Sequence, residues 1–360
     1  MRVTAEPLLR HYWYPVAFAS DLGGAPLARR LLGTDVVLWR DAEGRPACAA
    51  DRCPHRDAKL SRGWTEDGAV VCPYHGWRYG SDGKCVLIPQ NAPGQRISPR
   101  AVVATYPVTE ALGLLWVCLD PASEPATAMA GIPAIPQFGQ PGWRVVQEFD
   151  TVWPCSAPHL LDNNLDPAHI AFVHRRTFGN PRTPHIDRVE ITRSAAGIRL
   201  VSRVPVYARP GETGVTERRT TTDVYAPFTG VFHIRYPDGL SHIMVKAIAP
   251  VDDGTCRLLQ FVVRNDTEAD RPAADIIAFD SAVRDEDWCV LETMPPDYHL
   301  DLTANVHIDT DRATIAYRRL LAEATAGTWR PAGPAGPAGE AGAEPDGALA
   351  AEIDAVLRTS

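Results

Sequence analysis

The feature that most constrains this chain is a pair of short loops that each carry one cysteine and one histidine. The first loop is Cys53-Pro-His55, and the second, Cys72-Pro-Tyr-His75, begins after sixteen intervening residues. Thiolate and imidazole side chains are metal ligands, so a fold that uses both loops must bring them together. Gly63 and Gly76 permit tight turns beside the ligands. The sequence therefore predicts a small domain that holds metal between two loops.

Two kinds of metal centre use two cysteines and two histidines. A [2Fe–2S] cluster of the Rieske type has two thiolates on one iron and two imidazoles on the other. A structural zinc ion takes the same ligands, but zinc motifs usually pair cysteine with cysteine and histidine with histidine along the chain. Each loop here supplies one of each, which suits a cluster whose two irons differ. We therefore expect Cys53, His55, Cys72 and His75 to bind a [2Fe–2S] cluster, with zinc as the alternative.

The pattern of strands, turns and helices divides the chain. Short β-rich runs fill the first 120 residues, with a hairpin turn at Asp41–Gly44. Pro- and Gly-rich sequence follows, and then helical and antiparallel strand patterns alternate. The fold class is therefore α+β. The expected divisions are an all-β domain over 1–120 with its core at about 12–118, a connector over 121–150, a catalytic domain over 151–326, and a flexible Pro/Ala/Gly-rich tail over 327–360.

A second group of possible ligands lies in the segment 162–174, which contains Asn163, Asp166, His169 and His174. Two imidazoles and one carboxylate, with open coordination positions, are the ligands that Fe(II) uses for chemistry with O2. The two histidines are five residues apart, which on a regular helix places them about 140° apart. A bend, a bulge or a helix end must therefore separate them if both bind one ion.

The third ligand is expected from a helix over about 272–293. Its apolar residues lie on one face, and Asp287 falls within about 20° of Ile276 on that face. A carboxylate among apolar residues is costly unless it is paired or bound to metal. Asp287 is therefore the expected third ligand and Asp280, near the same face, is the reserve. The alternative is that Asp287 marks a partly exposed edge of the stripe.

These motifs together resemble the oxygenase (alpha) components of Rieske non-heme iron systems. CPHRDAKLSRG and VCPYHGWRYGSDGKCVLIP resemble the Rieske domain, the segment 162–174 resembles the histidine segment that binds iron, and DEDWCVLE resembles the helix that carries the third ligand. HYWYPVAF and NVHIDTDRATIAYRRLLAEA are similar to the single-subunit branch, which includes aromatic O-demethylases and hydroxylases of saxitoxin biosynthesis. The resemblance covers residues 10–325. It implies an all-β Rieske domain followed by a helix-grip-like domain, an antiparallel sheet with helices.

The resemblance also implies cofactors, partners and roles. A [2Fe–2S] cluster, a mononuclear Fe(II) and O2 as co-substrate are expected, with electrons from a separate NAD(P)H-dependent reductase, directly or through a ferredoxin. The family works as a ring, commonly a homotrimer, in which Asp166 would connect His75 of one subunit to His169 of the next. Asn163 is expected in the same catalytic segment. His307, Asp311, Arg312, Tyr317 and Arg318 have no derivable ligand role and are expected to hold the last helix in place.

The expected reaction is monooxygenation, a hydroxylation, of a small organic molecule of the specialised-metabolite kind. The alternatives are aromatic ring hydroxylation or O- or N-demethylation, and, more distantly, a Rieske electron-transfer protein or a zinc-stabilised binding module. Iron content separates these classes, because an oxygenase needs three irons per chain, an electron carrier two and a zinc module none.

The composition and sequence patterns argue against several other partners and settings. The net charge of −8 argues against nucleic acid, and the chain has no apolar run long enough to cross a membrane. The N-terminus lacks the pattern of a signal peptide, so a cytoplasmic protein is expected. Without a G-x-G-x-x-G motif after a strand, a nicotinamide or flavin domain is not expected within the chain. The other six cysteines are expected to be structural thiols.

Overall fold

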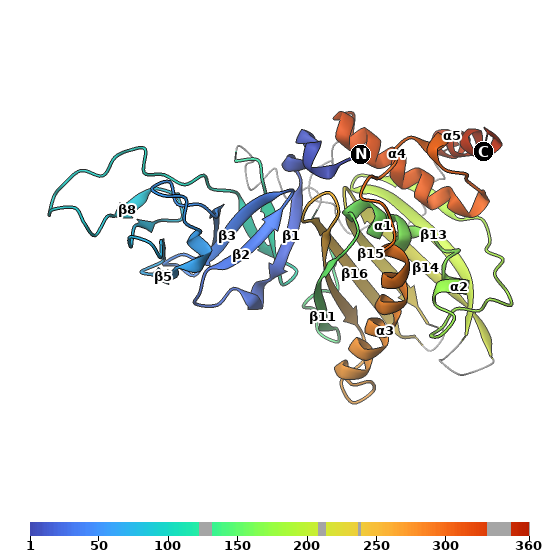
Figure 1. Cartoon of the computed structure of the whole chain (residues 1–360). Helices are drawn as coiled ribbons and strands as arrows, with labels where there is room; N and C mark the ends of the chain where they lie inside the picture. Colours follow the sequence, from blue (N-terminus) through green and yellow to red (C-terminus); the bar gives the residue numbers. More distant parts are fainter. Residues whose placement is uncertain (122–131, 208–213, 237–238, 330–346, 360) are drawn as a thin grey trace. The chain divides into compact units, whose positions relative to one another are not determined.

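The protein is described from a computed structural model, which covers residues 1–121, 132–207, 214–236, 239–329 and 347–359. The chain forms two compact units (Figure 1). One consists of Arg10–Met129, and the other of Met1–Leu9 with Ala130–Ser360.

The first unit is built of three small antiparallel sheets, with strand orders β1-β10-β9, β2-β3-β4 and β5-β6-β7-β8. The strands are β1 (Trp13–Phe18), β2 (Leu27–Leu31), β3 (Thr34–Arg40), β4 (Pro46–Ala50), β5 (Trp64–Glu66), β6 (Ala69–Val71), β7 (Arg78–Tyr79), β8 (Cys85–Leu87), β9 (Val108–Ala111) and β10 (Leu114–Cys118). The predicted hairpin joins β3 to β4, where the Asp41 and Arg45 backbones are hydrogen-bonded. The expectation of an all-β N-terminal domain is confirmed.

The second unit contains a seven-stranded antiparallel sheet of order β11-β17-β16-β15-β14-β13-β12. Its strands are β11 (Arg144–Trp153), β12 (Glu190–Ser194), β13 (Gly197–Tyr207), β14 (Val215–Tyr225), β15 (Thr229–Arg235), β16 (Ser241–Pro250) and β17 (Cys256–Arg264). Its helices are α1 (Ala157–Leu165), α2 (Ile170–Val173), α3 (Ala273–Leu291), α4 (Arg312–Ala326) and α5 (Gly347–Thr359). In Figure 1, α3 lies along the sheet, and Ile276 packs against Val146 and Val262. The α+β class is therefore confirmed.

Two of the predicted segments, the connector and the tail, contain regular secondary structure. Within the predicted connector over 121–150, β11 begins at Arg144 and pairs with β17. The Pro- and Gly-rich composition of the preceding residues hid the start of this strand. The expected flexible tail ends in a thirteen-residue helix, α5, whose Leu349 and Ile353 are buried. The Pro/Ala/Gly run itself, at 330–346, lies outside the described residues.

The last long helix is held beside the helix that precedes the histidine segment. Arg318 on α4 donates from Nη2 to Asp162 Oδ2 on α1 at 2.9 Å, and Tyr317 donates from its hydroxyl to the Pro227 carbonyl at 3.2 Å. Arg312 pairs with Asp309 and with Asp354 of α5. These contacts agree with the expectation that the end motif anchors the last helix. They also position α1.

No helix in the described part of the chain is long and apolar enough to cross a membrane. Among the described residues, no two cysteines are joined by a disulfide bond.

Candidate functional site

The two Cys/His loops of the first unit share one backbone design. In each, the cysteine N–H donates to the carbonyl five residues later, from Cys53 to Ala58 and from Cys72 to Trp77, both at 2.8 Å. The cysteine carbonyl accepts from the N–H four residues later, at Asp57 and Gly76, and both of these residues have a positive φ. Glycine adopts this conformation without strain, whereas Asp57 must tolerate it. The two loops are therefore closed in the same way and present their ligands toward each other.

The ligand side chains are arranged as a two-iron cluster needs. Cys53 and Cys72 are buried, and the ring centroids of His55 and His75 are 4.5 Å apart. The Nδ1 atoms of both histidines are buried without a hydrogen-bond partner. A buried nitrogen without a partner is costly unless a ligand completes it, so these atoms fit iron ligation.

Neighbouring aromatic rings enclose this site. Trp77 stacks on His55 with ring centroids 4.4 Å apart, and Tyr74 stacks on His75 at 4.0 Å. The Tyr79 hydroxyl lies 3.3 Å from Cys53 Sγ. A donor aimed at a cluster sulfur is one of the levers that set its reduction potential. The alternative of one zinc ion is disfavoured, because among the described residues these four ligands do not gather at single-ion spacing.

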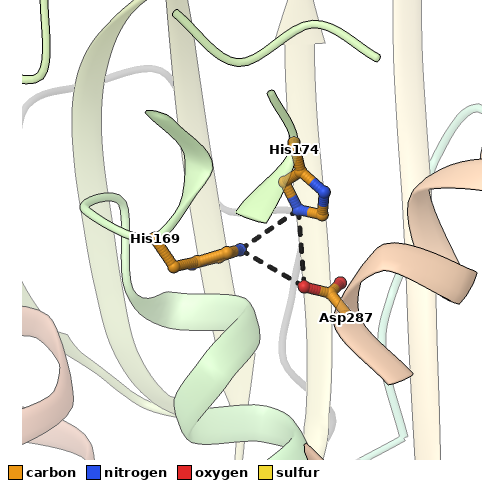
Figure 2. A group of neighbouring side chains, drawn as sticks. All are labelled: His169, His174 and Asp287. Carbon is orange, nitrogen blue, oxygen red and sulfur yellow. Dashed lines mark hydrogen bonds and ion pairs between the residues drawn. The ribbon is translucent and has the colours of Figure 1, made fainter. Parts of the chain in front are cut away.

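The second group of ligands does gather at single-ion spacing. One ligand atom from each of His169, His174 and Asp287 lies within 4.8 Å of the others (Figure 2). The two Nε2 atoms are 3.2 Å apart, and they lie 3.6 and 3.4 Å from Asp287 Oδ1. This oxygen is buried without a hydrogen-bond donor. Two imidazoles and one carboxylate that converge in this way fit a mononuclear Fe(II).

His169 and His174, five residues apart, can face the same point because they lie at the two ends of one short helix. His169 is the N-cap and His174 the C-cap of α2, so the four residues between them form one helical turn. The Asp166 carboxylate accepts from the backbone N–H groups of Ala168 and His169 at 2.7 and 3.2 Å. It thereby holds the start of the turn, after α1 has ended at Leu165. Both imidazoles can then face Asp287 on α3.

The ring orientation of His174 is set by Glu286, a neighbour that sequence reasoning missed. Its Nδ1 lies 3.1 Å from Glu286 Oε2, which also accepts from Thr177 Oγ1 at 2.7 Å. Burial lowers the pKa of His174 to about 4, although the negative charge of Asp287 acts to raise it. The neutral ring donates from Nδ1 to Glu286 and presents the Nε2 lone pair to the site. The acidic run 285–287 was the only sequence signal for Glu286.

Asp166 is placed to act on His169. Its Oδ2 lies 3.6 Å from His169 Nδ1. Burial acts to lower the pKa of His169, but Asp166 and Asp287 outweigh it and raise the pKa. Asn163 lies on α1 one turn before Asp166, and its amide nitrogen is buried without a partner.

The ligand group opens into a cavity of about 520 Å³ between the sheet and helices α1 to α3. Apolar residues such as Leu200, Val204 and Phe232 form part of its lining, together with the polar side chains of Asn164 and Lys246. The volume suits a small organic molecule.

The reserve ligand Asp280 does not join the iron group. It lies two turns before Asp287 on the same face of α3, and its carboxyl is hydrogen-bonded to Glu148 of β11. Burial raises the pKa of Glu148 to about 10, with further contributions from the hydrogen bond and charge of Asp280. At neutral pH the Glu148 carboxyl is therefore protonated.

Known proteins match both units. Residues 12–107 match the Rieske [2Fe-2S] domain, and residues 153–327 match the vanillate O-demethylase oxygenase C-terminal domain. The chain is 31% identical to methylxanthine N3-demethylase NdmB of Pseudomonas putida over 330 residues, which cover 86% of this chain and 88% of that protein. It is 28% identical to the chloroacetanilide N-alkylformylase oxygenase component of Rhizorhabdus wittichii, covering 90% and 97% of the two chains.

Solved structures agree with these sequence matches. NdmA of Pseudomonas putida CBB5 with caffeine superposes with a TM-score of 0.78 at 28% identity, over 90% of this chain and 93% of that one. Both domain types, the relatives along most of the chain, the paired Cys/His loops and the His/His/Asp group thus lead to one conclusion. The chain belongs to the Rieske non-heme iron oxygenases, as an oxygenase (alpha) component.

Proposed function

We propose that this protein monooxygenates a C–H bond of a small organic molecule held in the 520 Å³ cavity. The observation that carries the proposal is the convergence of His169, His174 and Asp287 at the wall of this cavity. When bound there, Fe(II) would supply the activation of O2. If the attacked carbon carries nitrogen or oxygen, the hydroxylated product loses formaldehyde, which is a demethylation. The demethylase names of the relatives favour this outcome.

The stoichiometry of such a demethylation shows how many electrons must reach the iron site. One methyl group and one O2, with two electrons and two protons, give a demethylated product, formaldehyde and water. The electrons would come from a separate NAD(P)H-dependent reductase, with or without a ferredoxin. In this proposal Cys53, His55, Cys72 and His75 hold the cluster that receives them.

The side chains around the iron group have supporting roles in this proposal. Glu286 orients His174 through Nδ1, so that Nε2 can bind the metal. Asp166 holds the turn that carries His169 and lies beside the Nδ1 atom of that ring. Asn163 would serve in the same segment, where its amide nitrogen is free to donate.

We also propose that electrons pass between subunits of a ring, from His75 of one chain through Asp166 to His169 of the next. Large apolar side chains are exposed near both ends of this route. Tyr74, beside His75, is 64% exposed, while Val306 and Ile308 are 79% and 61% exposed. Ile308 donates its N–H to Asp311, a carboxylate that interacts electrostatically with Asp166. Exposed apolar surface of this kind is typical of a subunit interface.

The test of function is a coupled assay with a surrogate reductase, NADH and ¹⁸O2. The panel would contain N-methylated purines, O-methylated aromatic acids and chloroacetanilides, and products would be identified by mass spectrometry. We expect a product that has gained one ¹⁸O atom or lost a methyl group with formaldehyde release.

The matched variant is His169→Ala. It should lose at least 100-fold in turnover and about one iron per chain, while the visible spectrum of the cluster stays unchanged. Turnover that persists without the third iron would contradict the proposal, and a wild-type protein with only two irons per chain would indicate an electron carrier.

A further inference from the structure

A lysine ammonium is enclosed in the cavity without a carboxylate partner. Lys246 projects from β16 into the cavity, and among the described residues no carboxylate oxygen lies within 4.0 Å of its Nζ. Burial lowers its pKa, although the negative charges of Asp287 and Asp280 act in the opposite direction. An enclosed charge is costly unless something pairs with it. The chain has only three lysines, so this placement is not part of a general lysine-rich surface.

The surrounding contacts hold this ammonium in place without neutralising it. Lys246 Nζ donates to Asn164 Oδ1 of α1. The Asn164 amide nitrogen donates to the Leu160 carbonyl at 2.7 Å, which fixes the side chain with its oxygen toward the lysine. Lys246 Nζ also lies 5.7 Å from the centroid of the Phe232 ring. An ammonium has three donors, so the Asn164 contact leaves donors for a ligand in the cavity.

The charges around Lys246 favour an anion. Arg218 also lines the cavity, with its guanidinium 5.2 Å from the centroid of the Phe178 ring and its Nε buried without a partner. Six basic side chains line the cavity, Lys246 and five arginines, against four acidic ones, so basic groups are in excess there. An enclosed site with this excess attracts negative charge, in a protein whose own net charge is −8.

We propose that the substrate is an organic carboxylate or similar oxyanion, and that Lys246 is the residue that pairs with its negative oxygen. This inference rests on the proposed function, because it places the anion in the cavity beside the iron group. Asn164 acts as a positioning residue that directs the ammonium. Arg218 adds a second positive charge at the same cavity.

The test measures binding by isothermal titration calorimetry on the purified, metal-loaded protein, without reductase and without O2. Two matched pairs of probes are used, 4-methoxybenzoate with 4-methoxybenzamide and hexanoate with hexanamide. Within each pair the shape is nearly constant and the charge changes. We expect the wild-type protein to bind at least one carboxylate roughly tenfold or more tightly than its amide.

Variants assign the preference to the lysine. Lys246→Met, which keeps the length and removes the charge, should weaken carboxylate binding by roughly 10- to 100-fold and change amide binding less than about twofold. Lys246→Gln, which can still contact Asn164, should behave in the same way if the methionine variant does not fold. The matched control is Lys84→Met, since Lys84 is an exposed lysine of the first unit that pairs with Asp82. It should bind all four probes as the wild type does.

Three results would overturn the inference. One is a wild-type protein that does not prefer either carboxylate over its amide, including one that binds none of the probes. The second is carboxylate binding that survives both Lys246 variants, which would place the anion on the metal instead. The third is an equal loss for carboxylate and amide. None of these depends on turnover, so a failed inference is distinguishable from a failed oxygenase assignment.

Discussion

At the scale of single residues, the His169/His174/Asp287 group, the proposed iron site, depends on side chains that do not themselves face the metal position. Glu286 is the clearest case, because it contacts His174 Nδ1 while its neighbour Asp287 faces Nε2. Glu286 and Asp287, which are adjacent on α3, thus lie beside the two different nitrogen atoms of the His174 ring. The carboxylate fixes the tautomer and raises the basicity of the ligand nitrogen.

Glu286→Gln should therefore weaken iron binding by roughly 10- to 100-fold and leave the cluster spectrum unchanged. The measurement is iron per chain at equilibrium with a competing chelator. Asp285→Asn is the matched control, since Asp285 is the adjacent carboxylate, is exposed and pairs with Arg284. Unchanged iron affinity in Glu286→Gln would contradict the orienting role.

At the scale of elements, the position of the histidine segment depends on how α4 holds α1. Asp162 and Arg318 form an ion pair at 2.9 Å, and each side chain is 13% exposed. Burial raises the pKa of Asp162 to about 6, while the charge and hydrogen bond of Arg318 act to lower it. Without Arg318, the carboxyl must either stay protonated or remain charged in a poorly solvated place.

Arg318→Met should therefore lower the free energy of unfolding by roughly 3–5 kcal/mol. Because the folded pKa of Asp162 would rise further above its unfolded value, the unfolded state binds fewer protons than the folded state between these two pKa values, and stability falls as pH rises. The loss should thus be larger at pH 8 than at pH 5.5, as checked by thermal unfolding. Arg319→Met, which breaks a pair with exposed Glu352, should cost about 1 kcal/mol or less.

The double variant of Asp162→Asn with Arg318→Met separates the buried charge from lost packing. It should recover part of the stability, because no uncompensated carboxylate remains. If Arg318→Met and the double variant have the same free energy of unfolding, the contact between α1 and α4 does not depend on the Asp162–Arg318 ion pair.

At the scale of the whole molecule, the proposed ring requires the exposed apolar residues near Asp166 to be covered by another chain. Val306→Asp should therefore dissociate the trimer and abolish reductase-coupled turnover, while both metal centres remain loaded. Sedimentation velocity would report the change from three chains to one chain of 39.2 kDa. Val145→Asp is the control, because Val145 is an exposed valine on β11. A monomeric wild type with full turnover would remove the inter-subunit route.

The sequence by itself determined the residue types of the proposed ligands and the fold class of each half of the chain. The cysteine and histidine side chains that would bind the cluster can be read directly from the sequence of the two loops. Local backbone hydrogen bonds close both loops in the same way. Helix periodicity nominated Asp287 over Asp280, because the face of a single helix is fixed by local geometry. The spacing of His169 and His174 required a helix end, and the structure places α2 between them.

Only the tertiary structure decided which distant side chains share one space. Lys246 lies on β16, Asn164 on α1 and Glu148 on β11, and no local pattern relates these three positions. They meet because the strands pair across the sheet and the helices pack on it, which depends on the order β11-β17-β16. The start of β11 at Arg144 was missed for the same reason, since its partner β17 lies more than a hundred residues away. Ligand identity is local in sequence, whereas the charge that surrounds a substrate is a property of the assembled fold.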